Sequence, residues 1–112
     1  MRTFVMMTKI APQDANIIEV SNKLKAHTKS NIARIEGIKK QCPEINFLAH
    51  YALLGPYDYM DIYEAPDETV AARVSLLSRG YGAFQIESWI AIPSKEIAEM
   101  TEGICSEESN SV

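Results

Sequence analysis

The sequence predicts a single α+β domain whose elements follow the order β-α-β-β-α-β. Gly55 and Pro56 form a tight turn between two runs rich in aromatic and branched residues, 45–53 and 57–64, which is typical of a β-hairpin. Segments with helical spacing of apolar residues flank this hairpin, and strand-like runs lie outside them at 3–9 and 83–92. This order predicts a four-stranded antiparallel sheet with both helices on one face.

The segment before the hairpin predicts a long helix from about residue 12 to Gln41. It is either one helix or two helices joined near residues 20–22, where Ser21 would cap the second. Its apolar residues recur at steps of three and four, or multiples of these. They are Ile17, Val20, Leu24, Ile32, Ile35 and Ile38. Its basic residues are interpreted as a solvated outer face, in preference to a nucleic-acid surface. They are Lys23, Lys25, Lys29, Arg34, Lys39 and Lys40.

The second half of the chain has clear helix boundaries. Asp67 can cap a helix whose inner face is formed by apolar residues at 70, 74 and 77, and Gly80 or Gly82 can end it. A short helix begins at Pro93, and the last residues are expected to be disordered. We therefore expect a domain over residues 1–101 and an acidic tail over residues 102–112.

Charge and cysteine content exclude several classes of protein. The net charge is −4, but residues 102–112 hold three of the 15 acidic residues and no Lys or Arg, so the domain is nearly neutral. A neutral domain argues against nucleic-acid binding through phosphate contacts. Cys42 and Cys105 lack metal-ligand spacing and are expected to be reduced thiols in the cytoplasm. The apolar runs are far shorter than the roughly 20 residues of a membrane helix.

The strands flanking the second helix each have an aliphatic side and an aromatic side. Residues 60 and 62, and residues 84, 86 and 90, form the aliphatic sides, which we expect beneath the helices. The aromatic sides each carry one carboxylate. They consist of Tyr57, Tyr59, Asp61 and Tyr63 in one strand, and of Glu87 and Trp89 in the other. Such an exposed aromatic patch predicts an interface, here a homodimer or higher oligomer assembled sheet to sheet.

Three of these segments resemble the GYD-domain family over about the first 100 residues. They are the opening strand 3–9, the turn Leu54-Gly55-Pro56-Tyr57-Asp58 and the helix entry Glu64-Ala65-Pro66-Asp67. The resemblance implies a ferredoxin-like fold of the dimeric α/β-barrel group. That group includes cofactor-free oxygenases, isomerases, haem enzymes and ligand-sensing domains, so it implies no particular reaction.

His50 and Asp61 are the candidates for catalysis. His50 is the only strand histidine and could transfer protons or bind haem, although hydrogen-bonded packing is the commoner role. Asp61 lies between two tyrosines, where desolvation would favour its protonated form and suit a general base. The alternative is a structural hydrogen bond across the dimer. Asp58 is expected to accept from backbone amides at its turn, and Glu87 to act as a similar base or to pair with Arg2 or Lys9.

Two classes of function are compatible with these residues. The first is a small dimer that binds an apolar or aromatic molecule beside the sheet, with or without cofactor-free chemistry. Its ligand site would be lined by Tyr59, Tyr63, Trp89 and Glu87, together with the two catalytic candidates. The second is a non-catalytic interaction or sensing module whose aromatic face only mediates oligomerisation. Neither reading calls for a cofactor or metal, and the residues do not decide whether the chain is an enzyme.

Overall fold

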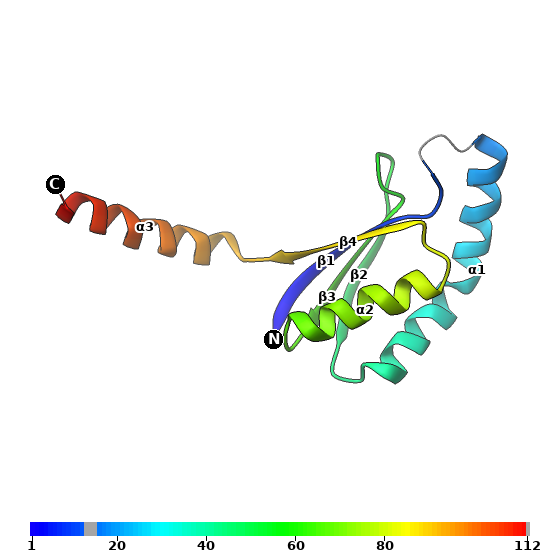
Figure 1. The fold of residues 1–112 in the computed structure, drawn as a ribbon, viewed down its shortest axis with the longest axis horizontal. Helices are drawn as coiled ribbons and strands as arrows, with labels where there is room; N and C mark the ends of the chain where they lie inside the picture. The colour runs from blue at the N-terminus through cyan, green and yellow to red at the C-terminus, as the bar shows by residue number, and fades with distance from the viewer. Residues whose placement is uncertain (13–15, 112) are drawn as a thin grey trace.

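The computed structural model describes residues 1–12 and 16–111, except for the side chains of residues 27, 28, 30 and 105–111. Its elements are β1 (Arg2–Lys9), α1 (Ile17–Gln41), β2 (Asn46–Ala52), β3 (Tyr59–Ala65), α2 (Glu68–Gly80), β4 (Gln85–Ala91) and α3 (Ser94–Ser111). The strands form one antiparallel sheet in the order β2-β3-β1-β4, with α1 and α2 on the same face (Figure 1). This is the ferredoxin-like α+β fold that the sequence predicts.

Helix α1 is a single helix bounded by hydrogen bonds at both ends. The Asn16 side chain accepts from the backbone N–H of Glu19 at 2.9 Å, which satisfies a donor that the first turn leaves unpaired. At the other end the N–H of Cys42 donates to the carbonyl of Ile38 at 2.8 Å. The helix is continuous through residues 20–22, so Ser21 caps nothing. It begins at Ile17 and not near residue 12; residues 13–15 lie outside the described part of the chain.

Helix α2 begins and ends where the sequence predicts. The carboxylate of Asp67 accepts from the N–H of Val70 at 3.0 Å. Gly80 is the last helical residue, and Gly82 has a φ of +96°, in the left-handed region that favours glycine. The N–H of Gly82 donates to the carbonyl of Arg79 at 3.1 Å, which closes the helix end.

Alanine at these two glycines is expected to have opposite effects on stability. Gly82→Ala should lower the free energy of unfolding by about 1–2 kcal/mol, because a Cβ is strained at a positive φ. Gly80→Ala is the matched control and should be neutral or stabilising by up to about 1 kcal/mol, as at other helical positions. Neither added Cβ would meet an atom within 4 Å, so urea denaturation would isolate the backbone effect. Equal effects of the two substitutions on the free energy of unfolding would contradict the predicted backbone strain at Gly82.

The turn between β2 and β3 is fastened to the end of β1. The N–H of Leu53 donates to the carbonyl of Asp58 at 2.9 Å, which closes the loop. The Asp58 carboxylate accepts from the N–H of Ile10 at 2.9 Å, and Lys9 Nζ donates to the carbonyl of Pro56 at 3.1 Å. Asp58 therefore accepts from a backbone amide, as its structural interpretation predicted, but the amide belongs to the segment after β1.

The core lies between the helices and the face of the sheet that they cover. Tyr63 is at its centre, with its ring stacked on Phe4 at a centroid distance of 5.7 Å and tilted against Phe47 at 5.8 Å. The buried cluster consists of Phe4, Met6, Ile38, Cys42, Ile45, Tyr63, Ala65, Val70, Ala71, Val74 and Ile86.

The prediction of which side of β3 faces the helices was wrong. Tyr59, Asp61 and Tyr63 are 7%, 1% and 0% exposed and lie on the covered face. The polar end of Tyr63 is accommodated there because its hydroxyl donates to the carbonyl of Ala71 in α2, at 3.5 Å. In β4 the prediction was correct for Ile86, which is buried under the helices, and for Trp89, which is 50% exposed on the other face.

The uncovered face of the sheet, called the open face below, carries two cross-strand rows of mainly apolar residues. The register of the strands aligns one row through Ala49, Ile62, Val5 and Trp89. It aligns the other through Tyr51, Met60, Met7 and Glu87. The open face is therefore aliphatic at its centre and aromatic toward its edges.

The C-terminal residues include a third helix, α3. Helix α3 begins at Ser94 and continues to Ser111, well beyond the short helix that was predicted. It extends away from the sheet as a separate arm (Figure 1). In the part of the chain that the structure describes, no helix is long and apolar enough to cross a membrane.

Candidate functional site

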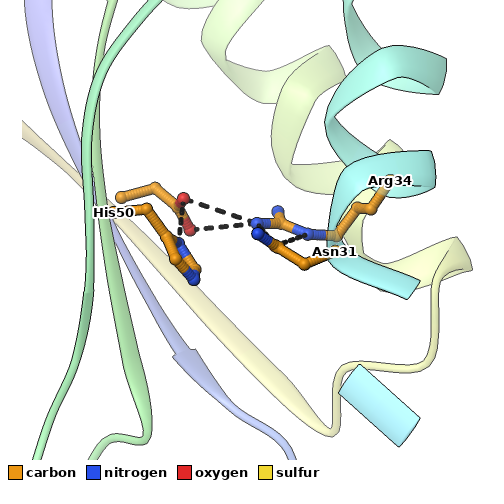
Figure 2. Close-up of polar contacts among 4 residues, drawn as sticks. Asn31, Arg34 and His50 are labelled. Carbon is orange, nitrogen blue, oxygen red and sulfur yellow. Dashed lines mark hydrogen bonds and ion pairs between the residues drawn. The ribbon is translucent and has the colours of Figure 1, made fainter. Parts of the chain in front are cut away.

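A polar cluster lies between α1 and the covered face of the sheet. Asp61 in β3 is the cross-strand partner of His50 in β2, and His50 Nδ1 lies 2.6 Å from Asp61 Oδ1. Arg34 approaches the same carboxylate from α1, with Nη2 at 3.4 Å from Oδ1 and 3.5 Å from Oδ2. Figure 2 shows the arginine and histidine side chains converging on the carboxylate between them. The cluster thus joins the two strands to the helix above them.

The first helix orients the arginine of this cluster. Asn31 precedes Arg34 by three residues, so both side chains lie on the same side of α1. The Oδ1 atom of Asn31 accepts from Arg34 Nη2 at 2.9 Å and from Nε at 3.3 Å. The amide therefore uses two of the guanidinium donors and directs Nη2 toward Asp61.

Burial is unequal across the cluster. The side chains of Arg34 and Asp61 are 3% and 1% exposed, whereas that of His50 is 27% exposed. The His50 ring stacks on Tyr59, with ring centroids 5.2 Å apart and an interplanar angle of 14°. The carboxylate and guanidinium are thus enclosed, and the histidine lies at the margin of the cluster.

This arrangement has two chemical uses. A carboxylate bound to one imidazole nitrogen orients the ring and selects its tautomer, as in acid–base dyads. A buried carboxylate shared by arginine and histidine can equally be a structural ion pair, in which each polar group satisfies another. Asp61 was expected to be desolvated between two tyrosines, and the structure adds the positive charge of Arg34 beside its carboxylate.

The predicted ligand-site residues do not come together on one surface. Tyr59 and Tyr63 lie on the covered face, whereas Trp89 and Glu87 lie on the open face. The Tyr57 ring contacts Trp89 edge to face at 6.5 Å. A hydrogen bond to Glu87, with that residue's negative charge, raises the pKa of Tyr57. Glu87 is therefore linked to the turn, and neither Arg2, which pairs with Glu68, nor Lys9 is its partner here.

A cavity of about 560 Å³ lies beside the turn, away from the polar cluster. It is lined by Lys9, Gly55, Pro56, Tyr57, Phe84 and Gln85. Three of these residues belong to the turn motif that the sequence singled out. Its volume is within the range of small-molecule sites, and its walls combine aromatic rings with one amine.

Arg34 is the residue of the polar cluster that sequence reasoning missed. It was interpreted as part of a solvated basic face, yet it is as buried as the core. Its spacing held the signal, because it precedes the buried residues Ile38 and Cys42 by four and eight positions. Among the described residues, no group of three or more His, Cys, Asp or Glu could hold a metal ion.

Comparisons with known proteins fit the resemblance in the sequence. A curated relative from Thermus thermophilus, named glutamine synthetase and cystathionine beta-lyase binding protein, is 25% identical over 97 residues, covering 87% of this chain and 95% of the relative.

Two solved structures are similar in outline. FFRP-DM1 has a TM-score of 0.46 and 19% identity, covering 82% of this chain and 100% of that one. Ribosomal protein S6 from Thermotoga maritima has a TM-score of 0.48 and 13% identity, covering 90% and 97%. The sequence profile of the GYD domain matches residues 4–101, which include both the turn motif and the polar cluster. The chain therefore belongs to the GYD domain family.

Proposed function

We propose that this protein is a non-catalytic protein-binding module that self-associates through its open face. The observation that carries the proposal is the enclosure of Arg34 and Asp61, which are 3% and 1% exposed. A general base must come within hydrogen-bond reach of its substrate. Asp61 is instead held by Arg34 and His50 beneath α1, so a structural role suits it better than proton transfer.

The open face supports self-association. Its two rows place aliphatic side chains at the centre of the sheet, with Trp89 at 50% and Tyr51 at 54% exposure toward the edges. Contiguous apolar surface of this kind marks interaction sites. A second copy would offer the same rows in a symmetric, sheet-to-sheet homodimer. The sheet-to-sheet mode of assembly is the one that the sequence predicts, but the opposite side of β3 would form the interface.

We also propose that the protein is located in the cytoplasm, where Cys42 would remain a thiol.

An enzyme is the proposed partner of the dimer. Support comes from the Thermus relative, whose name describes a protein that binds two enzymes. The test is to mix the purified full chain with glutamine synthetase and with cystathionine beta-lyase of its own host. Isothermal titration calorimetry and light scattering after gel filtration should detect a complex with at least one of them. Failure to bind either enzyme would contradict this choice of partner.

Substitution of two open-face residues should separate the proposed dimer. Ile62→Lys with Trp89→Lys places charges in the row that also contains Val5, where burial against a second sheet would leave them unpaired. Sedimentation velocity should then show a folded monomer. Leu76→Lys is the matched control, because Leu76 is 68% exposed on α2 and should leave the dimer intact. An unchanged dimer in the double variant would place the interface elsewhere.

Binding of a small aromatic molecule is the second candidate function, favoured by the cavity beside the turn. Tyr57 and Phe84 would contact an aromatic ring, and Lys9 would favour an anionic substituent. A panel of aromatic carboxylates should shift the amide resonances of Gly55 and Tyr57 in ¹⁵N-labelled protein. Lys9→Met should weaken that effect, and shifts spread evenly over the protein would argue against a site here.

A further inference from the structure

The side chain of Tyr57 links the cavity beside the turn to the open face of the sheet. Tyr57 lines the cavity and precedes β3 by two residues, whereas its ring meets Trp89 of β4 edge to face, with centroids 6.5 Å apart. Because β1 lies between β3 and β4 in the sheet, the side chain crosses β1 on the open-face side. Met7 of β1 is only 9% exposed although it belongs to the open face, which agrees with a ring lying above it.

Tyr57 also provides a hydrogen bond to a carboxylate of the open face. Its hydroxyl donates to Glu87, which is the cross-strand partner of Met7. The side-chain amide of Gln85 donates to Glu87 Oε1 at 3.5 Å. A carboxylate that a second sheet covers loses its water, which is costly unless other donors replace that water. Tyr57 therefore lowers the cost of burying this part of the open face.

The cavity lies where the open face ends. Two of its lining residues, Lys9 and Gln85, are cross-strand partners and lie two positions along β1 and β4 from Met7 and Glu87, so they share the open-face side. The turn supplies other lining residues, among them Tyr57. A molecule in the cavity would therefore contact the Tyr57 ring and the end of the open face together.

We propose that an aromatic carboxylate bound in this cavity strengthens self-association through Tyr57. Its ring packs against Tyr57 and its carboxylate meets Lys9, which holds the tyrosine over β1 with its hydroxyl on Glu87. A tyrosine turned away would leave Glu87 without this donor, so the ligand and the second copy favour the same position of the ring and bind cooperatively. The inference rests on the proposed open-face dimer and the proposed ligand site, and adds the coupling between them.

Two substitutions test the role of the tyrosine hydroxyl. Tyr57→Phe keeps the aromatic wall of the cavity and removes the donor to Glu87, so the dissociation constant of the ligand-free dimer should rise about tenfold. In a Glu87→Gln background, which has no charge to satisfy, the same change should raise the constant by no more than about threefold. Equal effects in the two backgrounds would show that the hydroxyl does not act through the carboxylate.

The dimer dissociation constant of the full chain, from sedimentation velocity, is the readout for the ligand. Benzoate should lower it about tenfold in the wild type, whereas acetate at the same concentration lacks a ring and should leave it unchanged. Tyr57→Phe should lose the response to benzoate. Tyr81→Phe is the matched control, because Tyr81 lines neither the cavity nor the open face, and it should respond as the wild type does.

The outcomes distinguish this coupling from the functions on which it rests. Benzoate that shifts the amide resonances of Gly55 and Tyr57 without changing the dissociation constant would overturn the coupling and leave both the dimer and the ligand site in place. Benzoate without effect on either measurement would overturn the ligand class and the coupling together. A chain that stays monomeric with and without benzoate would contradict the open-face dimer itself, and the coupling with it.

Discussion

Replacing Arg34 with methionine is expected to lower the free energy of unfolding by about 3–5 kcal/mol. The substitution keeps much of the side-chain volume but removes the guanidinium, so the Asp61 carboxylate stays buried without its cation. Asn31 also loses the donors that its side chain accepts from. Chemical denaturation at neutral pH would measure the loss. Arg79→Met is the matched control, since Arg79 is exposed and should change stability by no more than about 0.5 kcal/mol.

Removing both charges separates the structural role from a catalytic one. In the double variant Arg34→Met with Asp61→Leu, neither buried charge is left alone, so most of the lost stability should return. The double variant should also keep its oligomeric state and its binding to partner enzymes. An Arg34→Met variant as stable as Arg79→Met would show that the ion pair contributes nothing. A stable double variant that no longer binds would show that the cluster serves function directly.

The order of elements could be predicted because each boundary depends on local chemistry. Asp67 caps α2 through its own side chain, and Gly82 ends it through a dihedral angle that other residues resist. The Gly55-Pro56 turn likewise needs no information from distant residues. Such features depend on a few consecutive residues, so the sequence reveals them directly.

The orientation of β3 could not be predicted, because both of its sides are amphipathic. Alternation separates the tyrosine side from the Met60 and Ile62 side but does not say which one the helices cover. The answer depends on partners far along the chain: Ala71 accepts from the Tyr63 hydroxyl, and Arg34 pairs with Asp61. Polar groups that seemed to require solvent or a dimer interface are satisfied inside the subunit.

Only part of the polar cluster could be predicted, because its contacts also depend on residues far apart in the sequence. His50 and Asp61 were singled out individually, but their pairing depends on the register between β2 and β3, which has an irregularity between Phe47 and Ala49. A shift of one residue would have placed the two side chains on opposite faces. Arg34 was missed because five exposed lysines on the same helix suggested a uniformly solvated basic surface.

Stability is expected to fall steeply at high pH because of Tyr63. Burial raises the pKa of this tyrosine to about 12 in the native protein, from the ordinary value of 10.0. Below pH 10 the hydroxyl is protonated in both the native and unfolded states, so the preference of the core for the neutral form is fully present. Between pH 10 and about pH 12 the unfolded chain releases the proton while the native protein keeps it, which favours unfolding. The loss attributable to Tyr63 should reach about 2–3 kcal/mol.

Tyr63→Phe would isolate this contribution. The variant keeps the stacking on Phe4 and gives up the hydroxyl, which donates a long hydrogen bond of 3.5 Å to Ala71 and also interacts with the Ser88 side chain. Its unfolding free energy, measured by denaturant titration from below pH 10 to pH 12, should fall less steeply than that of the wild type. Tyr51→Phe is the control, because Tyr51 is 54% exposed and its removal should leave the pH dependence unchanged. Parallel pH profiles for wild type and Tyr63→Phe would mean that the hydroxyl ionises as readily in the native protein as in the unfolded chain.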